Sequence, residues 1–349
     1  MSSTQTQKAL ILEGPSGPFS MGEVPVRGPA PGEVLIKIHS AALTPADWKI
    51  PKYQIMVQEF PAILGSDIAG EIEAVGEGVN NFKKGDRVFC QAQDWKYGGA
   101  FQQYVSAIPD IVSKIPEALS YDDASTLPVA IATSYSGLYA DLPQGLGLTP
   151  PATEEGYGKY ANTPILVLGG ASSVGQAVIQ FAKISGFSPI IVTASLRNSD
   201  ALKEFGATHV LDRTLSPADI LAEVGKITST PVEYIFDVVA SESTQKLAVE
   251  LLAKSGGRVA FPTPFLSVSE TDNVKIAKVY AGPRVPWNLS LYQALYKEKL
   301  YEWIEKGFIA PNRSEALPGG LKGITEGLRR MEADEVSRLK LVAHPQETD

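Results

Sequence analysis

Apolar and polar positions along this chain follow two different periods. In roughly the first third, apolar runs are short or alternate with polar residues, as they do in β-strands, and glycines and prolines separate them. The predicted strands are ALIL (9–12), EVLIKIHSAAL (33–43), IAGEIEAVG (68–76) and DRVFC (86–90). Many short strands joined by such turns are typical of a barrel-like β domain.

The pattern changes near Tyr121. Residues Tyr121–Ala140 carry apolar positions at helical spacing and predict a helix, which Asp122 or Asp123 could cap. The following segment, Asp141–Asn162, is rich in proline, glycine and polar residues. We interpret it as a long surface loop, which a compact domain usually tolerates only for a reason.

Strand and helix patterns alternate from Thr163 onward. Apolar runs at 165–169, 189–195, 208–212, 233–240 and 257–262 predict strands. The helices between them are expected to start near Val174, Ser199, Ser216 and Ser243. Repeated strand–helix pairs predict a parallel, doubly wound sheet, so the fold class is α/β.

The last part of the chain predicts further elements. Val274–Gly282 is expected to be an edge strand, which could pair two subunits through their sheets or be blunted by its lysines. Leu289–Lys306 and Gly320–Met331 predict helices. A last strand near Leu339–Val342 is expected to return to the first domain.

Composition narrows the class of protein. The 349 residues suffice for two domains, and 44% hydrophobic with 20% charged residues is ordinary globular composition. A net charge of −8 argues against a nucleic-acid partner, which needs a basic field. No apolar stretch approaches the roughly 20 residues that cross a bilayer, and the start lacks a secretory pattern. With the single cysteine, Cys90, these features predict a cytoplasmic enzyme with no membrane partner.

The segment Gly169–Gly175 (GGASSVG) lies between a predicted strand and a predicted helix. A helix N-terminus offers free N–H groups and a positive dipole to a phosphate, and glycines let the backbone approach it. Serines replace the middle glycine of the usual pattern, but they are small and can donate hydroxyls. In this strand–turn–helix–strand context the turn predicts dinucleotide binding, and a purely structural turn is the alternative.

The end of the second strand of this unit indicates which dinucleotide binds. NAD-binding proteins have an acidic residue there that binds the ribose 2′-OH, whereas NADP-binding proteins lack this acid and supply positively charged side chains. This chain has Ser195 at that point, followed by Arg197 and Asn198, with Arg213 just past the next strand. A guanidinium can pair bidentately with a 2′-phosphate, so we predict NADPH as the cofactor. An ordinary loop cation at Arg197 is the alternative.

Metal ligands are scarce. Zinc needs three or four nitrogen, sulfur or carboxylate ligands. The chain has three histidines (His39, His209 and His344) and one cysteine, and none of them has a ligand spacing. We therefore expect no metal in the site.

Several motifs together resemble the zinc-independent branch of the medium-chain dehydrogenase/reductase superfamily. They are Ala30–Lys49, Phe60–Val88, Leu127–Leu138, the Gly169–Gly175 turn and the closing SRLKLV. Zinc-dependent relatives carry Cys near the position of Thr44 and Gly-His-Glu where this chain has Gly65-Ser66-Asp67. Within the branch, the chain looks most like fungal enoyl reductases, including the trans-acting enoyl reductases of polyketide clusters. Quinone reductases of the zeta-crystallin type look more distant.

The resemblance implies a GroES-like β-barrel catalytic domain over residues 1–127 and 300–349 and a Rossmann domain over 128–299, with a cleft between them. It also implies hydride transfer from NADPH to the activated C=C of an α,β-unsaturated carbonyl. The residues that it places at the cofactor are Thr133, Ser134, Ser172, Ser173, Val174, Ser195 and Arg197. The phosphate turn and the strand ends add Gly170, Asn198 and Arg213 as candidate cofactor contacts, although the family often has a tyrosine where Arg213 stands.

The candidate catalytic residues are Tyr53, Lys49 and Thr44. Without zinc, hydroxyls, N–H groups or a lysine must stabilise the enolate oxygen. Tyr53 is expected in a loop after TPADWK, where some enoyl reductases carry a functional tyrosine. Lys49 could donate directly or pair with Asp47, while Thr44 and Ser66 occupy former metal-ligand positions.

Substrate preference is harder to predict. Asp141–Asn162 and Phe261–Arg284 are expected to frame the pocket. Tyr280, Trp287 and Tyr292 could contact an apolar substrate or lie in the core. The alternatives to an enoyl or enone reductase are a quinone reductase, a trans-acting module that docks an acyl carrier, and a non-catalytic dinucleotide-binding protein. The protein is expected to be a monomer or a homodimer.

Overall fold

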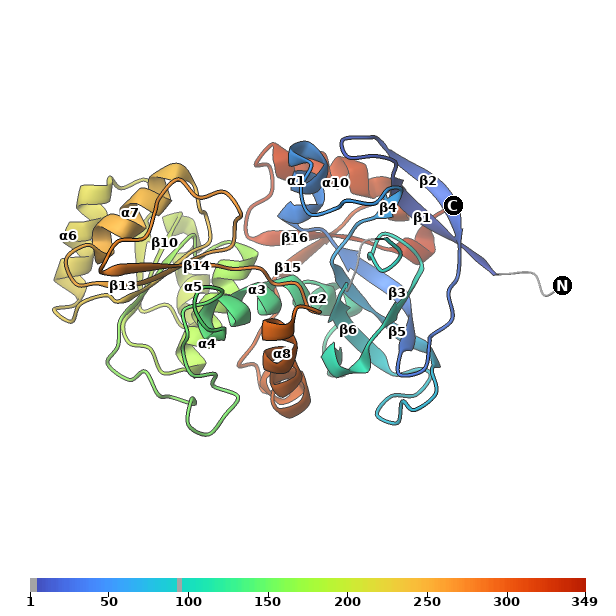
Figure 1. The fold of residues 1–349 in the computed structure, drawn as a ribbon, viewed down its shortest axis with the longest axis horizontal. Helices are drawn as coiled ribbons and strands as arrows, with labels where there is room; N and C mark the ends of the chain where they lie inside the picture. Colours follow the sequence, from blue (N-terminus) through green and yellow to red (C-terminus); the bar gives the residue numbers. More distant parts are fainter. Residues whose placement is uncertain (1–4, 93–95) are drawn as a thin grey trace. The chain divides into compact units, whose positions relative to one another are not determined.

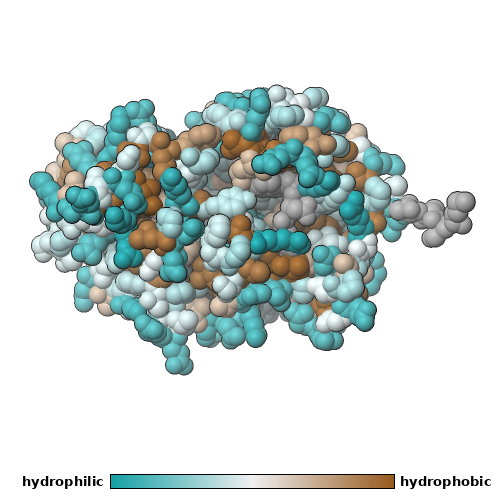
Figure 2. Space-filling model, in the orientation of Figure 1, coloured by the Kyte–Doolittle hydropathy of each residue, from teal (hydrophilic) through white to brown (hydrophobic). Residues whose placement is uncertain are grey.

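The computed structural model describes residues 5–92 and 96–349 of the chain (Figure 1). The chain divides into two units. Unit 1 is Met1–Val129, Tyr296–Glu305 and Pro311–Asp349, and unit 2 is Ala130–Leu295 and Lys306–Ala310. Over the described residues, no helix is both long and apolar enough to cross a membrane. The face drawn in Figure 2 is mostly hydrophilic, with smaller hydrophobic patches.

Unit 1 is the GroES-like β unit. Its larger sheet has the order β15-β16-β3-β5-β6-β8, with β7 also paired to β3, and a smaller sheet has the order β2-β1-β4. The strands are β1 (Thr6–Leu12), β2 (Phe19–Pro25), β3 (Val34–Ala42), β4 (Ala62–Ile63), β5 (Asp67–Val75), β6 (Arg87–Gln91), β7 (Tyr104–Ala107), β8 (Val112–Lys114), β15 (Arg313–Ala316) and β16 (Leu339–Ala343). The pairing of β16 with β3 confirms that the end of the chain returns to the first domain.

The core of unit 1 follows from the alternation in these strands. In the two central strands, β3 and β5, residues such as Ile36, Ile38, Ile68 and Ile72 are fully or almost fully buried. The backbones of the two strands also approach closely at Gly70, where a Cβ atom would lie 2.0 Å from the carbonyl oxygen of Lys37. Helices of unit 1 are α1 (Pro45–Tyr53), α2 (Tyr121–Ser125), α9 (Leu300–Glu305) and α10 (Ile324–Glu332).

The predicted helix over Tyr121–Ala140 is two helices in the structure. The first, α2, ends at Ser125, and α3 (Pro128–Tyr139) begins at a proline, which is favourable in the first turn of a helix. The cap predicted at Asp122 or Asp123 is wrong. Ser120 is the N-cap, and its Oγ accepts the backbone N–H of Asp123 at 3.0 Å.

Unit 2 is the predicted doubly wound sheet. Its six strands are all parallel in the order β11-β10-β9-β12-β13-β14. They are β9 (Ile165–Leu168), β10 (Ile190–Ala194), β11 (His209–Asp212), β12 (Tyr234–Asp237), β13 (Gly257–Phe261) and β14 (Val274–Lys278). The connecting helices are α4 (Ser173–Ile184), α5 (Ser199–Phe205), α6 (Pro217–Ile227) and α7 (Glu242–Leu252), and α8 (Pro286–Glu298) follows β14. The first strand of the unit, β9, lies beside the fourth, β12, so the strand order reverses there, where such sheets bind their ligands.

The segment Asp141–Asn162 has no helix or strand, as predicted, but the chain holds it in place. In its second half, the N–H of Gly158 donates to the carbonyl of Ile184 at 3.1 Å, and Tyr160 stacks on Phe187 with ring centroids 4.7 Å apart. Ile184 and Phe187 precede β10, so this half lies at the amino ends of the strands. The phosphate turn follows the carboxyl end of β9, so this half of the segment lies at the opposite end of the sheet from the turn.

The edge strand β14 is present, but its outer side is already bonded. The N–H groups of Val274, Ile276 and Lys278 alternate along the strand and face away from β13. They donate to the Thr271 hydroxyl (3.1 Å), the Glu270 carboxylate (2.9 Å) and the Pro143 carbonyl (2.8 Å). The predicted pairing of two subunits through this edge would have to break these bonds. Side chains and a loop cover the edge, rather than the lysines of the strand.

Removing the caps should expose the edge. The double change Glu270→Ala and Thr271→Ala frees two N–H groups, each bond being worth about 1 kcal/mol. We expect self-association to strengthen about tenfold in sedimentation velocity experiments. Glu270→Gln, which keeps an acceptor oxygen and loses only the charge, is the matched control. Equal association of the double variant, the control and the unaltered protein would rule out a role for these caps.

Candidate functional site

The phosphate turn joins β9 to α4 at the carboxyl edge of the unit 2 sheet. Ser172 is the N-cap of α4; its Oγ accepts the N–H of Gly175 at 3.1 Å and donates to the carbonyl of Gly169 at 2.8 Å. Gly169 has a φ of +88°, in the left-handed region that glycine tolerates best. The serine that replaces the usual glycine therefore builds the helix start.

The residues of this turn fit a pyrophosphate. A Cβ at Gly175 would lie 2.4 Å from the Gly169 carbonyl oxygen, so only glycine permits this tight backbone. The first-turn N–H groups of Ser173 and Val174 have no acceptor within the helix. The Oγ of Ser173 is buried and has no hydrogen-bond partner among the described residues. An anion at the turn would supply acceptors for these donors.

Thr193 was not predicted as part of this site. Its carbonyl accepts the N–H groups of Gly169 and Gly170 at 3.2 and 3.0 Å, and its hydroxyl accepts that of Gly169 at 3.1 Å. These bonds fix the start of the turn against β10. The signal in the sequence was a threonine inside an otherwise apolar run.

The predicted 2′-phosphate residues lie at the ends of β10 and β11. Ala194 and Asp212 are in register, and the N–H of Arg213 donates to the Ala194 carbonyl at 3.0 Å, so Arg213 lies beside the start of the Ser195 turn. Arg197 and Arg213 are exposed. Asp212, the last residue of β11, accepts hydrogen bonds from the N–H and the hydroxyl of Thr214 at 2.9 and 2.8 Å. Those bonds lower the pKa of Asp212.

Asn198 is part of the same turn but is buried. It ends the short 3₁₀ turn Leu196–Asn198, and its backbone N–H donates to the Ser195 carbonyl at 2.9 Å. With only 6% of its surface exposed, Asn198 shapes the turn that presents Arg197.

Asp237 is a second residue that sequence reasoning missed. It ends β12 in register with Leu168, the residue before the phosphate turn. Its Oδ1 accepts the N–H groups of Val239 and Ala240 at 3.0 and 2.9 Å. Burial raises the pKa of Asp237 to about 6, against the opposing effect of these hydrogen bonds and of Thr244. A carboxyl group with a raised pKa therefore lies at the reversal point of the sheet.

Thr133 and Ser134, both on α3, differ in what they can offer a cofactor. The Ser134 hydroxyl donates back to the carbonyls of Ala130 and Ile131 at 2.7 and 3.1 Å, and the residue is fully buried. Thr133 keeps 8% of its surface exposed. Of the two, Thr133 is the one with a surface that a ligand could touch.

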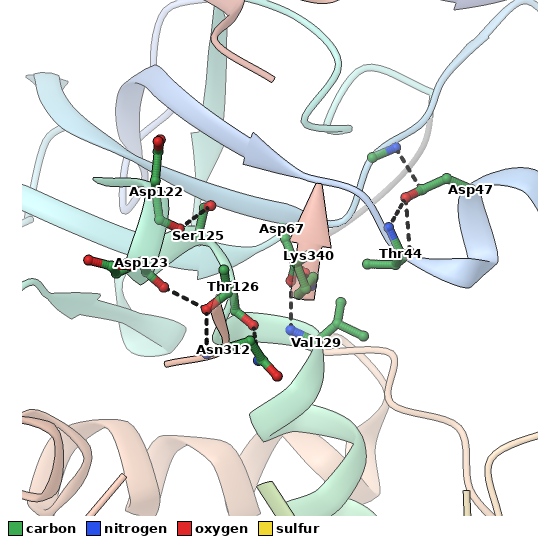
Figure 3. Close-up of polar contacts among 11 residues, drawn as sticks. Thr44, Asp47, Asp67, Asp122, Asp123, Ser125, Thr126, Val129, Asn312 and Lys340 are labelled. Carbon is green, nitrogen blue, oxygen red and sulfur yellow. Dashed lines mark hydrogen bonds and ion pairs between the residues drawn. The ribbon is translucent and has the colours of Figure 1, made fainter. Parts of the chain in front are cut away.

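In unit 1, Asp47 organises the start of α1 (Figure 3). Its Oδ2 accepts the N–H of Thr44 at 2.6 Å and the Thr44 hydroxyl at 2.9 Å, and its Oδ1 accepts the N–H of Gly65 at 3.2 Å. Asp47 is fully buried. Burial raises its pKa to about 7, although the bonds from Thr44 favour the ionised form. Asp47 thus bonds to Thr44 rather than to Lys49.

Asp67 and Lys340 form a buried ion pair in the same region (Figure 3). Asp67, on β5, has no exposed surface and Lys340, on β16, has 5%. The other carboxylate oxygen of Asp67 accepts the N–H of Val129, in the first turn of α3, at 2.7 Å. Burial raises the pKa of Asp67, and the Lys340 ammonium opposes that shift. No local pattern links two residues 273 positions apart, so the sequence did not predict Lys340.

A further contact in Figure 3 holds the segment that re-enters unit 1. The backbone N–H of Asn312 donates to the Thr126 hydroxyl at 3.0 Å, and the Asn312 amide donates to the Thr126 carbonyl at 3.2 Å. This contact lies next to the Asp67–Val129 bond in the chain. Both fix the start of α3 within unit 1.

Lys49 and Tyr53 lie four residues apart on α1 and therefore share one exposed face of the helix. Tyr53 is the last residue of α1 rather than part of a loop, and it is 47% exposed. Partial desolvation lowers the pKa of Lys49, with Asp334 opposing the shift. The Lys49 ammonium lies 5.5 Å from the centre of the Trp48 ring. The two strongest donor candidates therefore form one patch.

The resemblance noted in the sequence predicts that Thr44, Ser66 and Asp67 occupy the positions at which zinc-dependent relatives hold their metal. These residues offer two hydroxyls and a carboxylate already paired with Lys340, a donor set that does not fit zinc. Within residues 5–92 and 96–349, no three His, Cys, Asp or Glu side chains are grouped closely enough to hold a metal ion.

The strand order, the phosphate turn and the β unit together define a two-domain, dinucleotide-binding oxidoreductase. Two family models match, "Alcohol dehydrogenase GroES-like domain" over residues 30–117 and "Zinc-binding dehydrogenase" over 173–275. The chain belongs to the medium-chain dehydrogenase/reductase family, which uses NAD(P)H.

Two relatives support this assignment, and one solved structure shares the fold. A trans-enoyl reductase (himH) from Aspergillus japonicus is 33% identical over 85% of each chain. A trans-enoyl reductase from Gibberella fujikuroi is 33% identical over 89% of this chain and 92% of its own. The crystal structure of an alcohol dehydrogenase superfamily protein from Novosphingobium aromaticivorans superposes with a TM-score of 0.79 at 23% identity, covering 96% and 98% of the two chains.

The Asp47 carboxyl group should make stability depend on pH. Because its folded-state pKa is raised from 3.8 to about 7, the folded protein keeps this proton where the unfolded chain has lost it. The stabilising contribution is complete below pH 4 and disappears as the pH rises to 7. The unfolding free energy of the unaltered protein minus that of Asp47→Asn should fall over this range, measured by urea titration at each pH. Asp141→Asn, a change at an exposed acid, is the control, and a difference that instead grows with pH would contradict the raised pKa.

Proposed function

We propose that this oxidoreductase transfers hydride from NADPH to the activated C=C of an α,β-unsaturated carbonyl, without a metal ion. The choice of NADPH rests on the residue that follows β10. NAD-binding proteins carry an acidic residue at this position, and this chain has Ser195. Arg197 and Arg213, both exposed, are supplied by adjacent strand ends. The enoyl acceptor is supported by the two trans-enoyl reductases at 33% identity.

Cofactor binding in this proposal uses backbone and side-chain donors of unit 2. The first turn of α4 binds the pyrophosphate through its free N–H groups and the Ser173 hydroxyl. Gly170 lies at the start of the turn and Ser172 holds its shape. Arg197 and Arg213 pair with the 2′-phosphate, whose oxygens suit bidentate guanidinium contacts. Thr133, rather than Ser134, contacts the nicotinamide half.

The reaction leaves negative charge on the carbonyl oxygen of the substrate. NADPH held at this site would supply a hydride for the β-carbon; the carbonyl would become an enolate, and the α-carbon would then take up a proton to complete the reduction. The Tyr53 hydroxyl and the Lys49 ammonium, which share one face of α1, donate hydrogen bonds to that oxygen. The lowered pKa of Lys49 makes its ammonium a stronger acid than an ordinary lysine, which suits proton donation during the reaction.

Thr44 acts differently in this mechanism. A threonine hydroxyl has one proton, and that of Thr44 is donated to the Asp47 carboxylate. Thr44 therefore positions α1 and the groups that it carries, while Tyr53 and Lys49 act as the donors. With Thr44, Ser66 and the paired Asp67 at the former ligand positions, stabilisation of the enolate falls to these protein donors.

A second candidate is a trans-acting enoyl reductase whose substrate arrives on an acyl carrier domain. Both relatives at 33% identity are named trans-enoyl reductases. Comparison of turnover on an enoyl group attached to a carrier domain with turnover on the same group as a free thioester tests this candidate. A higher kcat/KM for the carrier-bound form supports carrier recognition, and equal values indicate an enzyme that acts on free substrates.

Optical measurement of NADPH oxidation with enals, enones, enoyl thioesters and quinones tests the reaction itself. We expect turnover with the enoyl compounds. Tyr53→Phe should lower kcat about a hundredfold through loss of one oxyanion donor, with little change in cofactor affinity. An arginine stays protonated to higher pH than a lysine, so the alkaline limb of the pH–rate profile of Lys49→Arg should shift to higher pH. Turnover with quinones alone would identify a quinone reductase, and tight NADPH binding without any turnover would identify a binding protein.

Arg197→Ala tests the choice of cofactor. Because the guanidinium contacts only the 2′-phosphate in this proposal, we expect NADPH to bind about 10–100-fold more weakly and NADH to be almost unaffected. Isothermal titration with both dinucleotides measures the ratio. Lys226→Ala, at the end of α6, removes a positive charge elsewhere on unit 2 and is the control. An equal loss for both cofactors would remove Arg197 from the 2′-phosphate site.

A further inference from the structure

Tyr280 lies where unit 2 would meet the substrate end of a bound dinucleotide. It follows β14 at the carboxyl edge of the sheet, the same edge as the phosphate turn. In sheets of this order, the strands on one side of the reversal point hold the adenosine half and those on the other side hold the nicotinamide half. β12, β13 and β14 form the second group, so Tyr280 lies on the nicotinamide side.

Hydrogen bonds from a buried side chain hold the Tyr280 loop, whose residues are not in a helix or strand. The Asn288 amide donates to the carbonyls of Tyr280 and Gly282 at 2.7 and 3.1 Å, and its oxygen accepts the Ser136 hydroxyl at 2.9 Å. Asn288 has no exposed surface. A buried amide with all its groups bonded is costly to disturb, so these hydrogen bonds oppose movement of the loop.

The same hydrogen bonds connect this loop to α3. Ser136 lies one turn after Thr133 on that helix, and its hydroxyl also contacts the Tyr292 hydroxyl at 2.5 Å. Tyr292, which the sequence left open as a substrate contact, is a core residue with 1% exposure. Tyr280 and the proposed cofactor contact at Thr133 are therefore held by one polar network within unit 2.

The Tyr280 ring packs against backbone on one side and is exposed on the other. A Cβ atom at Gly282 would lie 2.6 Å from a carbon of this ring, so the ring lies directly against the glycine backbone. The residue nevertheless keeps 44% of its surface exposed. A flat, rigid and exposed aromatic ring provides apolar contact area with little loss of side-chain entropy.

We propose that Tyr280 determines substrate specificity by packing its ring against the alkyl chain of the unsaturated carbonyl compound, with Asn288 as its positioning residue. This inference rests on the proposed enoyl reduction. The reacting alkene must lie about 3–3.5 Å from the nicotinamide, so its chain extends over the elements on that side. Longer alkyl chains gain apolar contact with the ring, whereas short ones do not reach it.

Kinetics with enoyl thioesters of 4 to about 10 carbons would test this proposal. For Tyr280→Ala we expect kcat/KM to fall about tenfold with the longest chains and less than about threefold with the shortest. Tyr280→Phe should keep the chain-length profile, because the ring rather than the hydroxyl makes the contact. Gly282→Ala should abolish the dependence on chain length, because the added methyl group displaces the ring of Tyr280 while leaving its chemistry unchanged. Tyr157→Ala, a change at an exposed tyrosine of the Asp141–Asn162 segment, is the matched control.

The outcomes separate this inference from the proposed function. Thermal melting and NADPH affinity should be unchanged in every variant, which excludes misfolding and a cofactor effect. If the unaltered protein reduces enoyl thioesters but Tyr280→Ala or Gly282→Ala leaves the chain-length profile unchanged, the assignment of Tyr280 is overturned while the enoyl reductase stands. If the unaltered protein reduces no enoyl compound, the proposed function and this inference both fail.

Discussion

An ionised carboxylate is costly to bury without a positive partner, and at Asp67 this constraint shapes unit 1. Removing one partner of a buried ion pair typically costs about 3–5 kcal/mol, because the other charge is left without compensation. Lys340 supplies that compensation from β16, so the last strand of the chain is bound to the first residue of β5. The second oxygen of Asp67 holds the first turn of α3 through Val129. One ion pair thus joins the N-terminal sheet, the C-terminal strand and the helix that leads into unit 2.

In the proposed function, the two units contribute groups of different kinds. Unit 1 surrounds its acids with donors, so that Asp47 and Asp67 fix α1 and α3 and leave Tyr53 and Lys49 exposed on one helix face. Unit 2 instead uses the backbone, because a glycine at 175 and a capped helix start leave N–H groups free for an anion. The nucleotide turn can thus tolerate small polar substitutions such as Ser172 for glycine. The donor patch on α1 depends on particular side chains.

The sequence predicted what depends on local patterns. The strands β9 to β13, the glycine-rich turn at Gly169–Gly175 and the edge strand β14 agree with the structure, because apolar periodicity and glycine spacing are local signals. Short strands such as β7 and β15 were missed, since four residues with mixed polarity carry little pattern. The Lys340–Asp67 pair, the Thr193 contact with the turn and the core position of Tyr292 arise from folding of distant segments. The sequence alone could not separate the exposed Tyr280 from the buried Tyr292, because both are tyrosines among apolar neighbours.

The covered side of β14 has a consequence for access. Thr271, Glu270 and Pro143 already accept the hydrogen bonds of the outward N–H groups of this edge. These donors are therefore satisfied without a strand from a second copy of the chain. The N–H groups of Val274, Ile276 and Lys278 are therefore closed to an incoming β-strand, whether from a second copy or from an unfolded chain, which protects this flank against strand addition.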